Sequence, residues 1–486
     1  MNFFKPFALE RFFAEHEFSA RYLLCSSDCE SFPVRELLAM ERDSIDGLLD
    51  LRLGYTETRG APELRMAIAA QYGGLGVGDV FVHAGAEEAI LNLFLAELSP
   101  GDTIIVNFPC YQSLAEIPRA LGCRVIPWEL RRSSEGGRTR WALDPDELPR
   151  LAGETSPTGG AGSPGFIPPK MIILNAPHNP TGALPTREEF EAVVARARRW
   201  GAVLLVDEVY RRLERDPARR LPAACEAYEN GVSLDVLSKH AGLAGLRIGW
   251  LATRRRDILD RVAQVKDYNS ICSSAPSEHL AGIAVRNLER IAARNRGIAA
   301  KNLALLDAFF KERPGFASWT LPEGSSIGFP RLNCGEDAEA LAVKLVREAG
   351  VLLLPGAYYA YDPAFFRVGY GRANMPEALA RLGRWLDEGG WPGLRDGGRR
   401  PADGDGATGS GDGADSPRDG AGKPRAGADS PRDGAGKPCA GAESPRDGAG
   451  NPRAGGSARP GELGGDGARA AGSAEGPAAE AESGGA

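Results

Sequence analysis

The chain has 486 residues, too many for one compact core, and its 43% hydrophobic and 25% charged content is that of an ordinary globular protein. A formal net charge of −7 argues against nucleic acid as the main partner, because nucleic-acid-binding domains usually present a basic face. The eight cysteines have neither CxxC spacing nor a His pair at metal-ligand spacing nearby, so we expect reduced thiols, a cytoplasmic protein and no metal site.

The first segment, residues 1–20, is rich in Phe but is interrupted by charged residues such as Lys5 and Glu10. A signal peptide needs an unbroken apolar stretch after a basic start, and this segment has neither. No later run is long and apolar enough to span a bilayer, so we expect no membrane partner. The segment is instead typical of an amphipathic arm that packs on a domain or on a partner subunit.

Short apolar, β-branched runs alternate with amphipathic helical stretches over the next part of the chain. A strand, a turn and a helix are expected over residues 81–98, and a strand followed by a helix over 103–121. Further strands are expected at 171–177 and 202–210, with a helix at 188–200 between them. This alternation predicts an α/β fold with a parallel sheet and helices on both faces.

The remaining segments differ in character. A Gly/Pro/Ser-rich stretch, 153–169, is expected to be a surface loop. A long helical stretch over 275–311 is expected to bridge to a second domain, and 316–389 has strands and helices of its own. From about 396 the chain is a low-complexity repeat, in which GADSPRDGAGKPRA at 413 recurs with small changes at 427 and 441. A repeat without large apolar side chains cannot offset its ordering entropy, so residues 396–486 are predicted to form a disordered tail without an assigned role.

Polar and aromatic side chains follow the ends of the expected strands. Ligands of open α/β sheets bind at the carboxyl ends of the strands, so residues at these ends are candidates for one shared site. Spacing alone does not show that they converge. The candidates are Gly85, Ala86 and Glu87 between a strand and a helix, then Tyr111, Asn179, Asp207, Tyr210, Ser238 and Lys239.

Five motifs occur in an order and spacing that resembles one protein family. They are RGAPELRMAIA at 59–69, NAPHNPTG at 175–182, VDEVY at 206–210, LSKHAGLAGLRIGW at 237–250 and FRVGYGR at 366–372. Together they resemble the fold-type-I aminotransferases of class I/II, the aspartate-aminotransferase-like enzymes, over about residues 20–390.

The resemblance implies pyridoxal 5'-phosphate as cofactor, a homodimer, and amino-acid and 2-oxo-acid substrates. It also implies a mostly parallel, seven-stranded sheet in a large cofactor-binding domain, residues 46–285. Residues 1–45 would form an N-terminal arm and part of a smaller α+β domain. The interdomain helix and the rest of that domain would occupy 286–395.

The resemblance also implies roles for residues that would touch the cofactor ring. Lys239 resembles the lysine that holds the cofactor as a Schiff base, and a lowered amine pKa helps such a group act as nucleophile and proton carrier. Asp207 resembles the aspartate that keeps the pyridine nitrogen protonated. Tyr210 and Asn179 resemble the pair that hydrogen-bonds the phenolic oxygen. Taken alone, Lys239 also fits a surface lysine, Asp207 a helix N-cap and Asn179 a turn residue.

A second set of residues would bind the phosphate. Following Gly85, the backbone N–H groups of Ala86 and Glu87 lie at an expected helix N-terminus, which favours anions. Arg247 resembles the family's phosphate arginine, suited to bidentate contact. Ser238, directly before Lys239, is also implied to bind the cofactor. Tyr55 resembles a tyrosine that reaches the phosphate of the neighbouring subunit. Many relatives carry Ser three positions before the lysine, where this chain has Val236.

Three residues are implied to align the reactants. Tyr111 resembles the aromatic residue that stacks on the cofactor ring, although a core aromatic residue fits the same pattern. Arg367, together with Asn179, resembles the group that binds the substrate α-carboxylate. The rigid guanidinium fork fixes the substrate's orientation, which decides which Cα bond breaks.

The motifs therefore favour amino transfer from an L-amino acid to a 2-oxo acid. An alternative is a lyase or cyclase, because LLCSSDCESFPVREL at 23–37 replaces the relatives' Gly-Glu/Asp-Pro segment. That stretch, KDYNSICSSAPSEHL at 266–280 and GFPRL at 328–332 resemble the capreomycidine-synthase-like branch. A non-catalytic regulator is disfavoured because the motifs begin by about residue 50, and a nicotinamide dehydrogenase because GGLGVG at 73–78 has the wrong glycine spacing.

Overall fold

The computed structural model describes residues 4–135, 138–154, 166–334 and 337–391. All of them belong to one compact unit, Met1–Asp403. The predicted disordered tail, 396–486, and most of the predicted surface loop at 153–169 lie outside the described residues. No described helix combines the length and the apolar character needed to cross a membrane.

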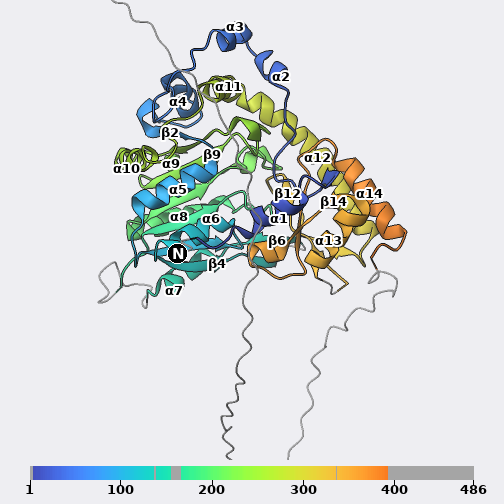
Figure 1. Ribbon diagram of the computed structural model, residues 1–486. Helices are drawn as coiled ribbons and strands as arrows, with labels where there is room; N and C mark the ends of the chain where they lie inside the picture. Colours follow the sequence, from blue (N-terminus) through green and yellow to red (C-terminus); the bar gives the residue numbers. More distant parts are fainter. Residues whose placement is uncertain (1–3, 136–137, 155–165, 335–336, 392–486) are drawn as a thin grey trace, which may run out of the picture. The chain divides into compact units, whose positions relative to one another are not determined.

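A seven-stranded sheet is the centre of the fold (Figure 1). Six strands follow the predicted parallel pattern, and one, β10, is antiparallel to both of its neighbours. The predicted α/β class with a mostly parallel seven-stranded sheet is thereby confirmed. In spatial order the strands are β2 (Val80–His83), β10 (Gly249–Ala252), β9 (Gly231–Val236), β8 (Val203–Asp207), β7 (Met171–Asn175), β3 (Thr103–Phe108) and β4 (Arg124–Glu129).

Helices cover both faces of the sheet, as the alternation predicted (Figure 1). In β3, Ile104 contributes to the core beneath α5 (Ala86–Glu97), α6 (Gln112–Ala120) and α10 (Arg256–Lys266). The next residue, Ile105, points to the opposite core, which includes α8 (Arg187–Trp200). Strands covered on both faces lose the apolar/polar alternation, and every residue of β7, β8 and β9 is buried.

The strand register aligns the ends that carry polar residues. Asn175 at the end of β7 lies beside Asp207 at the end of β8. Lys239 follows β9, the next strand in the sheet, after two residues. The Asn175 amide donates to the backbone carbonyl of Asp207 at 2.9 Å, which ties the two strand ends together. The parallel order thus brings residues from distant parts of the chain to one edge.

The predicted helical stretch over 275–311 is present, with one interruption at Asn287. The structure has two helices, α11 (Ala275–Arg286) and α12 (Leu288–Glu312). The Asn287 side chain donates to the Ile283 carbonyl at 2.9 Å and to Glu41 Oε1 at 3.0 Å. A side chain that bonds a carbonyl one turn earlier competes with the helical backbone pattern, which accounts for the break.

Helix α12 leads from the sheet to the predicted C-terminal strands and helices (Figure 1). These include α13 (Ala338–Ala349), α14 (Met375–Asp387) and a three-stranded antiparallel sheet of β12 (Ile327–Gly328), β16 (Phe366–Gly369) and β15 (Leu354–Pro355). The N-terminal segment joins this part, because β1 (Tyr22–Leu23) pairs in parallel with β14 (Val351–Leu352). The predicted boundaries at 45/46 and 285/286 stay predictions.

Several shorter elements complete the described chain. α1 (Ala8–His16) buries Leu9 and Phe12, as expected of an amphipathic arm. The others are α2 (Val34–Leu38), α3 (Ser44–Leu49), α4 (Pro62–Ala69), β5 (Arg131–Glu135), β6 (Arg138–Ala142), α7 (Leu148–Ala152), α9 (Ala224–Ala227), β11 (Ala317–Ser318) and β13 (Arg331–Leu332).

Candidate active site

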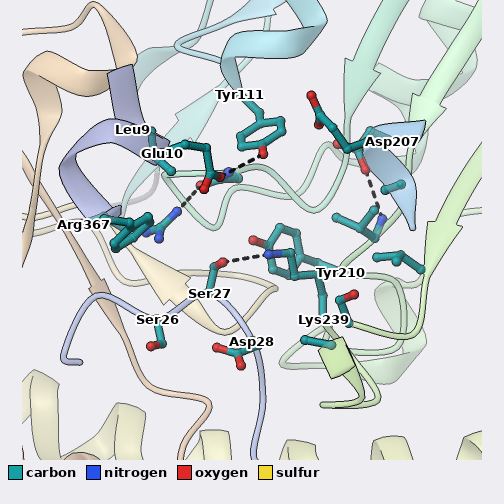
Figure 2. A pocket seen from close by; sticks show the side chains of 18 of the residues that line it. Leu9, Glu10, Ser26, Ser27, Asp28, Tyr111, Asp207, Tyr210, Lys239 and Arg367 are labelled. Carbon is teal, nitrogen blue, oxygen red and sulfur yellow. Dashed lines mark hydrogen bonds between the residues drawn. The ribbon is translucent and has the colours of Figure 1, made fainter. Parts of the chain in front are cut away.

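A cavity of about 490 Å³ lies at the carboxyl ends of the central strands. It is lined by every residue predicted for the site except Gly85 and Tyr55. Its remaining wall comes from α1, from residues 26–28 and from β16 with the turn after it (Figure 2). The structure therefore brings together Ala86, Glu87, Tyr111, Asn179, Asp207, Tyr210, Ser238, Lys239, Arg247 and Arg367.

Lys239 occupies the loop that follows β9. Its Nζ donates a hydrogen bond to Ser27 Oγ at 2.9 Å. Burial lowers the pKa of the amine, the nearby Asp28 carboxylate opposes that shift, and the Arg367 guanidinium adds to it. An amine with a lowered pKa keeps more of the neutral form, which is the nucleophilic form.

Asp207 ends β8 and is 5% exposed. Its Oδ1 accepts the Val209 backbone N–H at 3.3 Å. Burial raises the pKa of this carboxyl to about 7, against the lowering effect of Lys239. A buried carboxylate with this pKa is stabilised by any cation placed against it, so the position suits a protonated ring nitrogen.

Tyr210 and Asn179 lie on the side of the cavity nearer to Arg367. Tyr210 is 1% exposed, and burial raises the pKa of its phenol, so the phenol stays protonated. Asn179 Oδ1 accepts the Tyr359 hydroxyl at 2.9 Å and lies 3.4 Å from Arg367 Nη1. Sequence reasoning did not identify Tyr359, which lies in a segment without a recognised motif.

One end of the cavity is built for an anion. Gly85 precedes α5 with a φ of 95°, and a Cβ there would lie 2.6 Å from Arg247 Nη2. The glycine therefore lets the guanidinium approach the first N–H groups of the helix, which have no partner within the helix. Ser238 Oγ is buried without a hydrogen-bond partner among the described residues. These donors fit a phosphate group.

Glu87 differs from the other groups at this anion-binding end because its side chain is a carboxylate. Its Oε1 accepts the Ser113 hydroxyl at 2.6 Å. Burial raises the pKa of the carboxyl, Glu10 adds to the rise, and Arg247 and Lys239 oppose it. A raised pKa reduces its negative charge, which lessens its repulsion of an anion held by the neighbouring backbone N–H groups.

Arg367 comes from β16 and is 3% exposed. Its Nε donates to the Cys25 carbonyl at 3.0 Å and its Nη1 to the Tyr359 hydroxyl at 2.5 Å. It forms no ion pair with any carboxylate of the described ranges. A buried guanidinium held by neutral acceptors is suited to an anionic group of a ligand.

Tyr111 is the N-cap residue of α6 and contacts α1. Its ring lies 5.2 Å from the Phe7 ring between centroids, and its hydroxyl donates to Glu10 at 3.5 Å (Figure 2). Tyr55, by contrast, lies outside the cavity and is 90% exposed. Its predicted contact with a neighbouring subunit stays a prediction.

The cavity wall that sequence reasoning missed is the N-terminal one. The segment 23–37 stood out as a departure from the family pattern, but its residues received no roles. They lie about two hundred positions from Lys239, so only the tertiary structure shows that they meet. The additional polar residues are Glu10, Glu17, Ser26, Ser27, Asp28 and Arg372.

The described residues contain no group of His, Cys, Asp and Glu side chains arranged to hold a metal ion.

Comparison with known proteins agrees with this arrangement of amine, carboxylates and guanidinium groups in the cavity. The family model for aminotransferase class I and II matches residues 22–382. The chain is 28% identical to capreomycidine synthase from Streptomyces vinaceus over 388 residues, which cover 78% of this chain and 93% of the relative. It is 27% identical to valine–pyruvate aminotransferase from Mycobacterium tuberculosis over 360 residues, 69% of this chain and 84% of the relative.

Solved structures give the same result. A pyridoxal-phosphate-dependent aminotransferase from Streptococcus suis has 30% identity and a TM-score of 0.71, covering 79% of this chain and 98% of its own. The pyridoxal-phosphate-dependent cyclase OrfR has 27% identity and a TM-score of 0.71, covering 79% and 97%. The chain belongs to the aminotransferase class I and II family of fold-type-I enzymes that depend on pyridoxal phosphate.

Proposed function

We propose that the protein is an aminotransferase that moves the amino group of an L-amino acid to a 2-oxo acid. The observation that carries the proposal is the shared cavity of Lys239, Asp207 and Arg367. One anion-binding end, formed by the backbone behind Gly85, by Arg247 and by the Ser238 hydroxyl, which has no partner among the described residues, fits the cofactor phosphate. When bound, pyridoxal phosphate supplies an electron sink for the charge left at Cα when a proton is removed.

The chain's own residues would bind the substrate, hold the cofactor and transfer the proton. Arg367 would bind the substrate α-carboxylate and orient Cα. Lys239 would hold the cofactor covalently and, once displaced by the substrate amine, take the Cα proton on Nζ and return it to the cofactor carbon. Asp207 would hold the proton on the ring nitrogen, and Tyr210 with Asn179 would hydrogen-bond the phenolic oxygen.

The test of this function is a screen of amino acids with the purified protein, without a 2-oxo acid. A transaminase converts its bound cofactor to pyridoxamine phosphate and releases one equivalent of 2-oxo acid. Mass spectrometry of the released cofactor and product identifies both. A cofactor that always returns as pyridoxal phosphate while the substrate is consumed would contradict amino transfer.

The wall formed by α1, which carries Glu10, and by Glu17 directly after it indicates which substrate side chains to screen first. Glu10 and Glu17 form no ion pair with a described arginine or lysine of the cavity. Burial raises the pKa of Glu17, the Arg372 guanidinium opposes the rise, and the charges of Asp28 and Glu10 add to it, so these carboxylates repel one another beside an arginine that already pairs with Asp28. A cationic substrate side chain would relieve that repulsion, whereas a second substrate carboxylate would add to it.

A second candidate function is elimination with ring closure on a substituted amino acid. The resemblance to capreomycidine synthase, which covers 93% of that relative, and the TM-score of 0.71 to a cyclase favour it. So does the segment 26–28, which puts a hydroxyl and a carboxylate beside Lys239 in place of the family's usual segment. Loss of a substituent from the product, with the cofactor recovered as pyridoxal phosphate, would identify this reaction.

Substitution of Arg367 tests the predicted carboxylate contact. We expect Arg367→Gln to lower kcat/KM for the amino acid by about 10²- to 10³-fold, since each hydrogen bond to a charged group contributes about 1.5–3 kcal/mol. The corresponding amine, which lacks the carboxylate, should bind equally well to both proteins. Steady-state kinetics and inhibition by that amine measure the two effects. The exposed Arg347→Gln is the matched control. An equal loss of affinity for the amine would contradict the assignment.

We also propose a homodimer, in which Tyr55 reaches the partner's phosphate. Leu49, Leu53 and Tyr55 are 76%, 80% and 90% exposed, an apolar patch that a second copy would cover. We expect a double substitution, Leu49→Glu with Leu53→Glu, to shift the protein toward monomer and to weaken cofactor binding. Analytical ultracentrifugation measures the first effect. Leu305→Glu, 46% exposed on α12, is the control. A wild-type protein that sediments as a monomer would contradict the proposal.

A further inference from the structure

Ser27 contacts the amine on which the proposed function depends. Its Oγ accepts a hydrogen bond from Lys239 Nζ at 2.9 Å, although the two residues are 212 positions apart (Figure 2). The same hydroxyl forms a hydrogen bond with the Tyr210 phenol, which opposes the rise in pKa that burial causes there. Ser27 thus lies between the amine and the phenol, two groups that the proposed function places against the cofactor.

The loop that carries Ser27 is fixed from several sides. The Ser326 hydroxyl donates to the Ser27 carbonyl at 2.7 Å. The Cys29 backbone N–H donates to the Lys239 carbonyl at 3.2 Å, so this loop and the lysine loop are bonded directly to each other. Arg372 holds Asp28 through contacts at 2.9 and 3.0 Å to its two carboxylate oxygens. The Ser27 hydroxyl therefore has a defined place relative to the amine.

A hydroxyl suits either protonation state of the amine. It accepts a hydrogen bond from an ammonium group, and it donates one to the lone pair of a neutral amine. The Tyr210 phenol, which stays protonated, can donate to Ser27 Oγ when Ser27 donates to the amine. A carboxylate at the same place would favour the ammonium form alone, and an alanine would favour neither.

We propose that Ser27 is a positioning residue for Lys239: its hydroxyl holds the released amine where Nζ can take the substrate's Cα proton and pass it on. In this transfer the C–H bond at Cα breaks, its proton goes to Nζ, and Nζ then delivers it to the acceptor atom. Ser27 keeps its own proton throughout and changes only the direction of its hydrogen bond. The role rests on the proposed function and applies equally to amino transfer and to elimination, because both begin by removing that proton.

The first experiment measures exchange of the substrate's Cα hydrogen with solvent deuterium by NMR. We expect Ser27→Ala to slow exchange by about 10- to 100-fold, less than the about 10²- to 10⁴-fold of a group that itself transfers the proton, because Ser27 only positions the amine. KM should change little, since Ser27 does not hold the substrate carboxylate. Ser27→Thr, which keeps the hydroxyl, should recover most of the rate. Ser31→Ala, an exposed position in the same loop, is the control.

The second experiment needs no turnover. The pKa of the Lys239 amine in the cofactor-free protein follows from the pH dependence of its acetylation, measured by mass spectrometry. Loss of a charge-assisted acceptor should lower this pKa by about half a unit to one unit in Ser27→Ala, and Ser27→Thr should restore it. If Ser27→Ala does not fold, Ser27→Gly removes the same hydroxyl without placing a methyl group in the loop.

The outcomes separate this role from the proposed function. Unchanged exchange and an unchanged amine pKa in a folded Ser27→Ala protein would overturn the role of Ser27. Failure of the wild-type protein to exchange any amino acid's Cα hydrogen would overturn the proposed function, while the amine titration would still measure the coupling of Ser27 to Lys239. A pKa shift together with slower exchange supports both.

Discussion

Replacing Lys239 with alanine is expected to lower turnover by about 10³-fold or more, because one substitution removes both the covalent attachment and the proton carrier. No second lysine of the cavity can take over these two roles, since Lys239 is the one lysine among the residues that line it. The visible absorbance of the lysine-bound cofactor should disappear as well. Absorbance spectra and single-turnover kinetics of the purified variant measure these two losses separately.

Two further variants make the result specific. Lys239→Arg keeps a positive charge in the cavity but cannot attach the cofactor, so it should be as inactive as Lys239→Ala. Lys311→Ala removes an exposed lysine that pairs with Asp307 and should behave as wild type. Full turnover in a folded Lys239→Ala protein would contradict the assignment of Lys239 as the lysine that holds the cofactor and carries the proton.

Substitution of Asp207 by asparagine is expected to lower kcat by about 10²- to 10³-fold while leaving the cavity shape intact. Asparagine has nearly the same size as aspartate but cannot hold a proton on the ring nitrogen by its charge. The loss should appear in kcat, and the cofactor should still bind at Lys239. Steady-state kinetics with a saturating amino acid and the absorbance of the bound cofactor test both statements.

Although Asp207→Asn should lower kcat, it should raise the free energy of unfolding of the cofactor-free protein near and above neutral pH. Burial raises the pKa of Asp207 from 3.8 to about 7, so between these values the native state binds more protons here than the unfolded chain. The free energy of unfolding therefore falls as the pH rises through this window, by about 4 kcal/mol in total, at about 1.4 kcal/mol for each pKa unit. Asp207→Asn removes this contribution.

Urea unfolding of the cofactor-free proteins at pH 5 and pH 8 measures the difference. Wild type should lose more stability than Asp207→Asn between the two values, and the variant should be the more stable protein at pH 8. Asp267→Asn, at an exposed position, controls for the change in net charge. An equal loss in wild type and in Asp207→Asn would show that the carboxyl at 207 is not desolvated.

Much of this cavity could be predicted because its residues follow strands with a clear sequence pattern. Asp207 comes at the end of an apolar run that is buried on both faces, and Asn179 follows another. In a parallel sheet such ends meet at one edge, so the sequence pattern of the strands also places their polar residues. The anion-binding turn at Gly85 follows the same rule, since a strand leads directly into a helix there.

The N-terminal wall could not be predicted in the same way. Ser27 contacts Lys239 from a loop that follows β1, and a strand of two residues such as β1, which pairs with β14, has no periodicity to detect. At the break, the Asn287 side chain bonds Glu41 of a distant segment as well as the local Ile283 carbonyl, and the sequence pattern shows neither bond. The role proposed for Tyr55 needs a second copy of the chain, and a single chain shows only that this side chain is exposed.

The pairing of β1 with β14 has a consequence for the order in which the protein acquires its properties. One side of the cavity cannot exist until residues near 22 have found residues near 351, which is among the most distant encounters in the described chain. Closing so long a loop is entropically costly and late during folding. The sheet, whose strand ends carry Asp207 and lead to Lys239, can therefore be complete before the N-terminal wall with Ser27 and Asp28 is in place beside it.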